Sequence, residues 1–327
     1  MELIAPEVNP PARAAPGHAA TRAALLAWYA RQGRDLPWRR TSDPYHVLVA
    51  EFMLQQTQVE RVIPKYHAFL AAYPTLQALA EAPAAGVIRA WSGLGYNRRA
   101  VNLQAVARQI VAEHGGVIPD DPAVLERLHG IGRYTAGAVA CFGYRRDVAV
   151  LDTNIRRVLH RVYHGPEAPA PRASERELWA LAAAALPPGR GYDWSQALMD
   201  LGALLCTASR PLCPACPLVD LCRAAPAFLQ YGLPQRAQRA LRERQAGYRP
   251  ATPFKQTTRY FRGRIVEVLR ALPPGASLAL GELGPRVRDD YHAGLAGWLR
   301  ELVRALARDG LVTVDESAAE PRLALPE

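Results

Sequence analysis

Apolar residues recur at intervals of three and four through most of the first two thirds of this 327-residue chain. That period gives an α-helix one buried face, whereas the strict alternation typical of strands is scarce here. Glycine or proline ends most of the periodic segments, at Gly33, Pro64, Pro83, Gly115–Gly116 and Pro187–Pro188. The pattern predicts an all-α bundle of short helices between residues 21 and 223, with segments at 23–31, 47–62, 75–80, 100–114 and 176–186.

The pattern changes on both sides of this helical region. Residues 1–20 are rich in Pro and Ala without periodicity and predict a mobile tail, and residues 224–257, rich in Gln, Arg and Pro, predict a linker. In residues 258–327, helical segments at 259–272, 278–287 and 297–308 precede strand-like runs at 310–314 and 321–325. Three helices followed by a hairpin outline a small winged-helix-like unit, although a generic helical appendage would give a similar pattern.

The amino-acid composition and the net charge indicate what kind of molecule the protein binds. Half of the residues are hydrophobic, yet no stretch reaches the ~20 consecutive apolar residues of a membrane helix. The net charge is +10 and the pI is about 9.7, which favours a polyanion such as nucleic acid. Nearly all basic residues are arginine, since the only lysines are Lys65 and Lys255. A GC-rich genome explains that choice of residue but not the excess of bases over acids.

Four of the five cysteines lie close together, as Cys206-x6-Cys213-x2-Cys216-x5-Cys222, in a Pro-rich stretch. Four thiolates hold a 4Fe–4S cluster, and the prolines favour an irregular loop on which sulfurs converge. A tetrahedral zinc site is the competing interpretation, but such sites usually use two short cysteine pairs and this run has one. Disulfides are less expected, because the chain shows no secretory signal. Cys141, in an apolar run, is interpreted as a small buried side chain.

A Gly-rich segment and a carboxylate follow each other in the middle of the chain. Residues 128–137 read Leu-His-Gly-Ile-Gly-Arg-Tyr-Thr-Ala-Gly, in which Gly130 and Gly132 predict a tight turn between two helices. A turn without side chains lets backbone N–H groups at the start of the second helix approach a phosphate. Further along, Asp152 precedes a helix that carries Arg156 and Arg157. This order indicates a DNA-binding hairpin followed by a candidate catalytic carboxylate.

Together, the hairpin, Asp152 and the cysteine run resemble the helix–hairpin–helix DNA glycosylase superfamily, which includes endonuclease III and the MutY-type adenine glycosylases. The resemblance covers residues 23–223, and the ordered set of features is highly specific. It implies a two-lobed helical core in which the hairpin grips the DNA backbone and Asp152 is catalytic. It also implies that the cysteine loop, residues 206–222, binds a 4Fe–4S cluster.

The same resemblance implies roles for the active-site residues. Bifunctional members carry a nucleophilic lysine in the second helix of the hairpin; Tyr134 stands there, so a monofunctional glycosylase that activates water is expected. Glu51, within residues 50–59 that match the MutY-type signature, would protonate adenine at N7, and its apolar neighbours would keep it protonated. Asp152 would stay ionised and stabilise the cationic sugar. Tyr134 and Asn154 would hydrogen-bond within this site.

Further residues are expected to contact DNA, because the base must leave the duplex to reach the active site. Gln55 would hydrogen-bond base edges and Tyr96 would stack near the mismatch. The full set of expected DNA and base contacts is Arg39, Gln55, Thr57, Tyr96, Gly130, Gly132 and Gln196.

The chain departs from the family pattern at three places. Asn97 stands where adenine glycosylases usually have a second tyrosine, and Thr153 stands where glycine is common. Many members also carry a Nudix-like domain that recognises 8-oxoguanine, and the residues after 223 are too few and of the wrong pattern for it. We therefore expect a variant without that domain and a weaker preference for oxidised guanine.

We expect a monofunctional glycosylase that removes adenine mispaired with 8-oxoguanine or guanine in base excision repair. It would act as a monomer on double-stranded DNA containing a mismatch, in the bacterial cytoplasm with the nucleoid and without a membrane. One alternative is a thymine or uracil glycosylase for G:T and G:U pairs, which typically has basic residues in place of Gln55 and Gln56. The other is a non-catalytic iron–sulfur DNA-binding protein, against which Glu51 and Asp152 argue.

Overall fold

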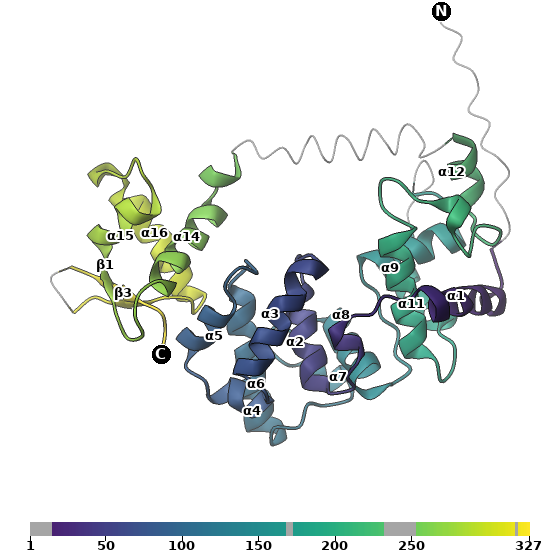
Figure 1. Cartoon of the computed structure of the whole chain (residues 1–327), viewed down its shortest axis with the longest axis horizontal. Helices are drawn as coiled ribbons and strands as arrows, with labels where there is room; N and C mark the ends of the chain where they lie inside the picture. Colours follow the sequence, from purple (N-terminus) through teal and green to yellow (C-terminus); the bar gives the residue numbers. More distant parts are fainter. Residues whose placement is uncertain (1–14, 168–172, 232–252, 318–319) are drawn as a thin grey trace, which may run out of the picture. The chain divides into compact units, whose positions relative to one another are not determined.

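A computed structural model describes residues 15–167, 173–231, 253–317 and 320–327 (Figure 1). Most of the expected tail and of the expected linker lies outside these residues. The chain divides into two compact units, each made of two stretches of sequence. We call residues 1–40 with 137–249 the cysteine-loop unit, and residues 41–136 with 250–327 the hairpin unit. No helix in the described ranges combines the length and apolar character needed to cross a membrane.

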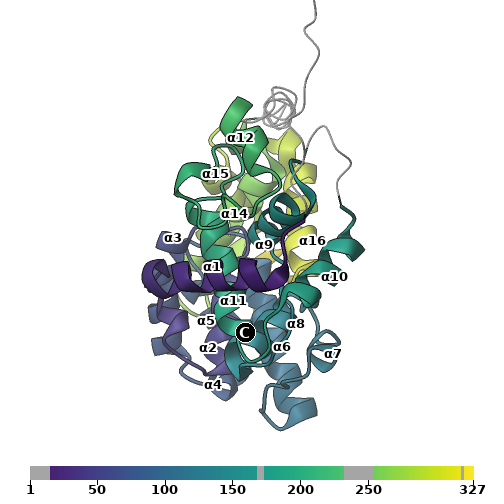
Figure 2. The same ribbon diagram turned by 90° about the vertical axis from the view of Figure 1, so that its right-hand side faces the viewer.

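The cysteine-loop unit is built around α11 (Gly191–Leu204). α1 (His18–Gln32) packs across α11, and α9 (Thr153–Leu159) packs against it as well (Figure 2). The other elements are η1 (Pro37–Arg39), η2 (Val139–Gly143), η3 (His160–His164), α10 (Glu175–Ala185), η4 (Cys213–Ala215) and α12 (Ala225–Tyr231). α10 begins with a capping box, in which Ser174 and Glu177 each accept a backbone N–H of the other.

Close packing of α9 on α11 depends on one glycine. A Cβ atom at Gly202 would lie 2.6 Å from the Cβ of Asn154, which is far inside van der Waals contact. Any larger residue would push the two helices apart. Because α9 starts directly after Asp152, Gly202 sets the position of this carboxylate relative to the body of the unit.

In the hairpin unit, the first helices gather on α6 (Arg98–His114). α2 (Pro44–Leu54) and α4 (Leu76–Glu81) both contact α6. Gln104 of α6 donates from its side-chain amide to the carbonyls of Leu79 at 3.1 Å and Ala82 at 2.7 Å, which holds the end of α4. The remaining helices of this part are α3 (Val59–Ala72), α5 (Ala84–Ala90), α7 (Pro122–Leu125) and α8 (Arg133–Ala138).

Two predictions for this region are wrong. The single helix expected at 47–62 is two helices, because the backbone of Gln56 turns into the left-handed region with φ 53°. Pro64, expected to end a helix, lies inside α3. The helix continues past this proline because Tyr66 and Phe69 are buried, and their burial outweighs the one lost backbone hydrogen bond.

The residues from 253 onward combine helices with a small sheet. The sheet is antiparallel in the order β1-β3-β2, with Leu278 and Val314 both opposite Leu323 on its two sides. The predicted helices and hairpin are present; β1 was not predicted, because two residues are too few to show alternation. The elements are η5 (Phe254–Gln256), α14 (Thr258–Arg270), β1 (Leu278–Ala279), α15 (Leu280–Val287), η6 (Ala293–Leu295), α16 (Ala296–Arg308), β2 (Thr313–Asp315) and β3 (Arg322–Ala324).

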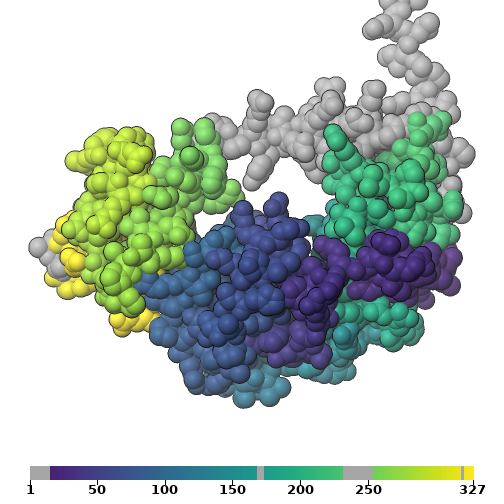
Figure 3. All heavy atoms as spheres, in the orientation of Figure 1, coloured from purple at the N-terminus to yellow at the C-terminus, as the bar shows by residue number. Residues whose placement is uncertain are grey.

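This C-terminal part shares a hydrophobic core with α5. Ile88 of α5 is fully buried in the same cluster as Ile265 and Leu269 of α14. Arg270 donates to the carbonyl of Ile88 at 2.9 Å, and the N–H of Ala85 donates to the carbonyl of Pro326 at 2.6 Å. The space-filling view shows the yellow-green C-terminal residues packed on the blue α5 region (Figure 3).

Candidate active site

Glu51 is a buried carboxyl on an otherwise apolar helix. It is 6% exposed and lies one turn before the end of α2, whose side chains from Val47 to Met53 are buried. Pro44 occupies the first turn of the helix, and Asp43 caps it by accepting the N–H of Tyr45 at 2.8 Å. Because buried carboxyl groups concentrate at functional sites, Glu51 is a candidate acid.

Arg99 ties the end of α2 to a neighbouring loop. Its buried guanidinium donates to Thr57 Oγ1 at 3.0 Å and to backbone oxygens on both segments. These acceptors are the carbonyls of Phe52 (2.8 Å), Met53 (2.9 Å), Gln55, Leu94 (3.2 Å) and Gly95 (3.1 Å). Burial lowers the pKa of Arg99 to about 10. The guanidinium therefore satisfies the carbonyls that a helix end leaves without intrahelical partners.

The two segments that Arg99 joins carry the expected base contacts Gln55 and Tyr96. Tyr96 is 44% exposed and has a left-handed backbone, φ 46°, as has Gln56 at 53°. Non-glycine residues seldom adopt this conformation, and such strain concentrates at functional sites. Gln55, Gln56 and Tyr96 line a groove of about 710 Å³ together with Arg259 of α14. Arg259 donates to the Tyr96 hydroxyl at 2.8 Å.

The hairpin is formed by α7, the turn before Arg133 and α8. Gly130 has φ 79°, so its predicted torsional role is supported, whereas Gly132 has an ordinary φ. Nothing lies within 4 Å of a Cβ placed at Gly132, and the residue is exposed. A bare exposed backbone at this point is accessible to a phosphate. Tyr134, which follows in α8, is half-buried.

Asp152 is the N-cap of α9 in the cysteine-loop unit. One oxygen accepts the N–H of Ile155 at 2.6 Å, and the other accepts the side-chain amide of Asn154 at 3.1 Å. Burial raises the pKa of Asp152 above the ordinary aspartate value, and these hydrogen bonds and the charge of Arg157 limit the rise. The carboxylate is therefore held in one orientation at a site that penalises its charge.

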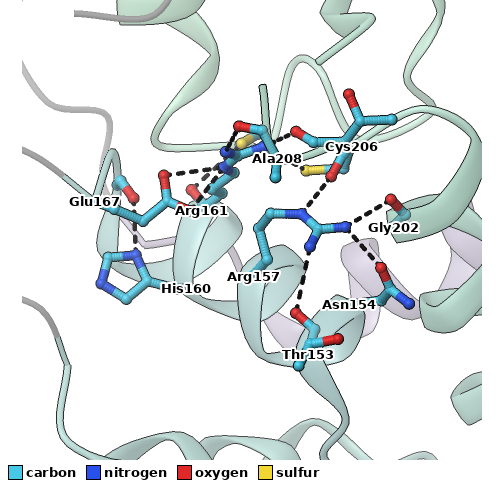
Figure 4. Close-up of polar contacts among 12 residues, drawn as sticks. Thr153, Asn154, Arg157, His160, Arg161, Glu167, Gly202, Cys206 and Ala208 are labelled. Atoms are coloured by element: carbon cyan, nitrogen blue, oxygen red, sulfur yellow. Dashed lines mark hydrogen bonds and ion pairs between the residues drawn. The ribbon is translucent and has the colours of Figure 1, made fainter. Parts of the chain in front are cut away.

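Arg157 links Asn154, the partner of this carboxylate, to the cysteine loop (Figure 4). Its guanidinium donates to Asn154 Oδ1 at 2.7 Å, so that Asn154 bridges Arg157 and Asp152. It also donates to the carbonyls of Gly202 and Cys206, both at 2.7 Å. Arg157 thus fixes the side chain that orients Asp152 and the backbone at the first cysteine of the loop.

The four cysteines of the loop line one small, otherwise mostly apolar cavity with Arg161 on its wall. Arg161 is 2% exposed and donates to Cys206 Sγ at 3.5 Å and to the carbonyls of Thr207 at 2.7 Å and Ala208 at 3.1 Å. All five cysteines of the chain are described, and none forms a disulfide; Cys141 is buried, as predicted. The described residues hold no group of three or more potential ligands already arranged around a metal ion.

The chemistry of these thiols fits a metal-ligand role better than a nucleophilic one. Burial raises the pKa of Cys216 to about 12 and that of Cys222 to about 11, so free thiolates are disfavoured. A bound metal centre deprotonates such thiols directly, because its positive charge replaces the missing solvation. Four sulfurs on one cavity wall are the donor set that a 4Fe–4S cluster requires.

Two further expected contacts lie in the cysteine-loop unit. Arg39 forms a bidentate pair with the fully buried Asp200, at 2.8 and 2.7 Å, and Arg34 donates to the same carboxylate. Burial alone would raise the pKa of Asp200, but these two arginines lower it. The arrangement favours a structural role for Arg39. Gln196 is a buried polar residue on α11.

The predicted residues therefore fall into two groups. The hairpin unit carries Glu51, Gln55, Thr57, Tyr96, Gly130, Gly132 and Tyr134, and the cysteine-loop unit carries Arg39, Asp152, Asn154, Gln196 and the four loop cysteines. Sequence reasoning missed the roles of Arg99, Arg157 and Asp200. In an arginine-rich chain nothing local marks an arginine whose partners are backbone carbonyls far away in sequence.

Comparison with known proteins agrees with this site. A family model described as HhH-GPD superfamily base excision DNA repair protein matches residues 49–184. A thermostable thymine-DNA glycosylase structure has a TM-score of 0.60 at 29% identity and covers 64% of this chain and 97% of its own. An endonuclease III–DNA covalent intermediate has a TM-score of 0.57 at 22% identity, covering 65% and 99%, and shows the fold alone. The chain is thus a base-excision DNA glycosylase with the helix–hairpin–helix fold.

Curated relatives narrow the class. The adenine DNA glycosylase of Mycobacterium tuberculosis (strain ATCC 25618 / H37Rv) is 45% identical over 253 residues, which are 76% of this chain and 77% of the relative. The human adenine DNA glycosylase is 44% identical over 214 residues, 63% of this chain and 39% of its own length. This chain belongs to the adenine DNA glycosylase family.

We predict that Arg99→Met lowers the free energy of unfolding by about 3 kcal/mol, because several carbonyls lose their only charged donor. Excision should fall as well, since the turn at Gln55 and the loop at Tyr96 lose their common anchor. Urea unfolding at neutral pH measures the free energy of unfolding. The matched control is Arg98→Met, which removes an exposed neighbour and should cost less than about 1 kcal/mol. Equal effects of both variants would contradict the anchoring role.

Proposed function

We propose that the protein is a monofunctional DNA glycosylase that hydrolyses the N-glycosidic bond of adenine mispaired with 8-oxoguanine or guanine. The observation that carries this proposal is a pair of carboxyls that are both largely withdrawn from solvent. Glu51 is buried on an apolar helix, and Asp152 is held by a backbone N–H and an amide. The identity of 45% to adenine DNA glycosylases supports adenine as the base.

The proposed reaction divides the work between these carboxyls. Glu51 donates a proton to N7 of adenine, which makes the base a better leaving group as the bond between N9 and C1′ of the sugar breaks. Asp152, as an anion, stabilises the cationic sugar that remains. Water then adds to C1′, and its proton passes to a carboxylate. Asn154 keeps Asp152 in position through its 3.1 Å hydrogen bond, and Tyr134 would hydrogen-bond in the same site.

Monofunctional chemistry follows from the absence of an amine nucleophile at the hairpin. Lysine occurs in the sequence only at positions 65 and 255, and α8 carries Tyr134 instead. Without a Schiff base to the sugar, cleavage of the abasic strand should be incidental.

DNA binding would use the exposed hairpin and the groove beside it. The bare backbone at Gly130 and Gly132 would contact phosphates, while Gln55 and Tyr96 would meet the bases around the mismatch. Thr57 would act from the same turn, and the side-chain amide of the buried Gln196 would bind the extruded base. The partner is double-stranded DNA in the cell interior, and one copy of the chain would suffice.

Two alternative functions are weaker. The likeness to a thymine-DNA glycosylase structure at 29% identity supports activity on G:T or G:U pairs, but the identity to adenine glycosylases is higher. A non-catalytic iron–sulfur DNA-binding protein would have no need for a buried Glu51 and an oriented Asp152.

The cysteine loop would hold a 4Fe–4S cluster through Cys206, Cys213, Cys216 and Cys222. Four thiols on one cavity wall and a guanidinium N–H directed at Cys206 Sγ support a four-thiolate metal centre, and the single short cysteine pair favours a cluster over zinc. The bound cluster would supply a rigid cross-link for a loop that has little secondary structure of its own. Through Arg157, that rigidity would reach Asn154 and Asp152.

We expect single-turnover assays to show excision of adenine from 8-oxoG:A and G:A duplexes, and none from G:T or G:U duplexes. Product strands are resolved after alkaline cleavage of abasic sites, and omission of alkali tests for lyase activity. Excision from G:T alone would establish the thymine alternative, and no excision from any duplex would favour the non-catalytic protein.

Asp152→Asn should abolish excision and leave duplex binding within severalfold of the wild type. The raised pKa of Asp152 means that its contribution to stability falls as the pH rises through the window from the unfolded-state to the folded-state pKa. The asparagine variant still caps α9 without a buried charge, so its melting temperature at neutral pH should equal or exceed that of the wild type. In the wild type, the acid limb of the pH–rate profile should lie above about 3.9, the ordinary aspartate pKa.

The matched control is Asp290→Asn, which alters an exposed aspartate of the C-terminal part and should leave the excision rate unchanged. Parallel loss of excision and DNA binding in Asp152→Asn would instead assign this residue a purely structural role.

Protein purified without oxygen should be brown, with broad blue–violet absorbance and four irons per chain expected for one cluster. Cys216→Ser should lose the colour and much of the soluble yield, whereas Cys141→Ser should keep the colour, because Cys141 is buried away from the loop. A colourless wild-type protein that contains zinc would refute the cluster.

A further inference from the structure

α16 presents a row of three arginines to solvent. Arg300, Arg304 and Arg308 follow each other at intervals of four residues and are all exposed. A rise of about 1.5 Å per residue places successive members about 6 Å apart along one face. The opposite face of α16 is fixed, because Leu299 and Leu306 are buried in the core of the C-terminal part. The helix therefore cannot turn this row of charges away from solvent.

These three arginines differ from most of the basic residues around them. Arg262 pairs with Asp309, Arg270 with Glu267 and Arg288 with Asp290. Arg259 donates to Tyr96, and Arg322 donates to Ser277.

Within the described residues, Arg300, Arg304 and Arg308 make no hydrogen bond or ion pair. The three arginines outnumber the acids beside them, which are Glu301 on the same helix and Glu316 across the groove, so this surface carries a net positive charge that favours an anion.

The row borders a groove of about 330 Å³ between α16 and the hairpin of β2 and β3. Val303 and Leu323 line it, and Val314 and Pro321 belong to its hairpin side. Glu316 is the acidic residue among the lining residues, against three arginines. An anionic occupant is therefore favoured on the helix side of this groove.

The chain order around α16 is that of a winged helix. α15 and α16 are consecutive helices joined by residues 288–295, and the sheet order β1-β3-β2 places a hairpin after the second helix. In helix–turn–helix proteins the second helix presents its exposed face to duplex DNA. In this chain that face is the one that carries Arg300, Arg304 and Arg308.

We propose that α16 is a second duplex-DNA contact, which binds backbone phosphates of DNA outside the site of base excision. The inference rests on the proposed function only in taking duplex DNA as the partner. The contact is independent of sequence, because arginine contacts to phosphates carry no base readout. It would keep the enzyme bound to undamaged DNA until a mismatch reaches the active site.

The test compares Arg300→Ala/Arg304→Ala with the control Arg31→Ala/Arg176→Ala, which removes two exposed arginines from the cysteine-loop unit. Fluorescence anisotropy with a labelled undamaged duplex gives the affinity at several salt concentrations. Loss of two phosphate contacts should make the slope of log K against log salt less steep by about 1.8 and weaken binding at least about 10-fold at about 0.1 M salt. The control should change neither by a comparable amount.

Excision under single-turnover conditions with saturating enzyme should stay within about twofold of the wild type, because chemistry is not altered at α16. A further variant, Glu301→Gln, removes an acid from the same exposed face and should tighten binding. Wild-type affinity and salt slope in the double alanine variant would overturn the second contact and leave the glycosylase assignment intact. Failure of the wild type to excise any base, with the salt effect present, would overturn the proposed function alone.

Discussion

Buried guanidinium groups hold the functional loops of this protein by donating to backbone carbonyls. Arg99 does so at the end of α2, and Arg157 and Arg161 do so at the cysteine loop. An irregular loop leaves carbonyls without partners, and each one buried unpaired costs about 1–3 kcal/mol. A guanidinium stays charged and offers five N–H donors in one plane, so one side chain serves several carbonyls. Some of the arginines therefore have a structural role, because they stabilise loops from within the protein.

A buried guanidinium also connects the candidate catalytic carboxylate and the candidate metal site of the cysteine-loop unit. Asp152 is oriented by Asn154, which is held by Arg157, which also binds the carbonyl of Cys206. Gly202 allows this chain of contacts to be short, because α11 approaches α9 at the backbone of Asn154. A change in the cysteine loop is thus transmitted to the carboxylate through two side chains.

Periodicity was sufficient for the long amphipathic helices. The segment at 100–114 corresponds to α6 and that at 176–186 to α10, because each buries one face on a neighbour. It failed around Gln56, where the chain turns through a left-handed residue that no propensity marks. It failed again at Pro64, because a proline is tolerated where the packing around it is strong. Arg39 was expected to contact DNA, but its ion pair with Asp200 favours a structural role. The sequence did not indicate this pair because Asp200 is distant from Arg39 along the chain.

The sequence by itself determined the class of this protein. The hairpin glycines, the carboxyls at 51 and 152 and the cysteine spacing are local patterns, because catalysis and metal binding require particular residue types at particular separations. Only the tertiary structure decided which arginines are scaffolding and which are free for an anion. That distinction depends on carbonyls and carboxylates far away along the chain. Arg99 has such partners and is buried, whereas Arg304 is exposed. Local sequence does not encode such distant partners, because folding alone brings them within hydrogen-bonding distance.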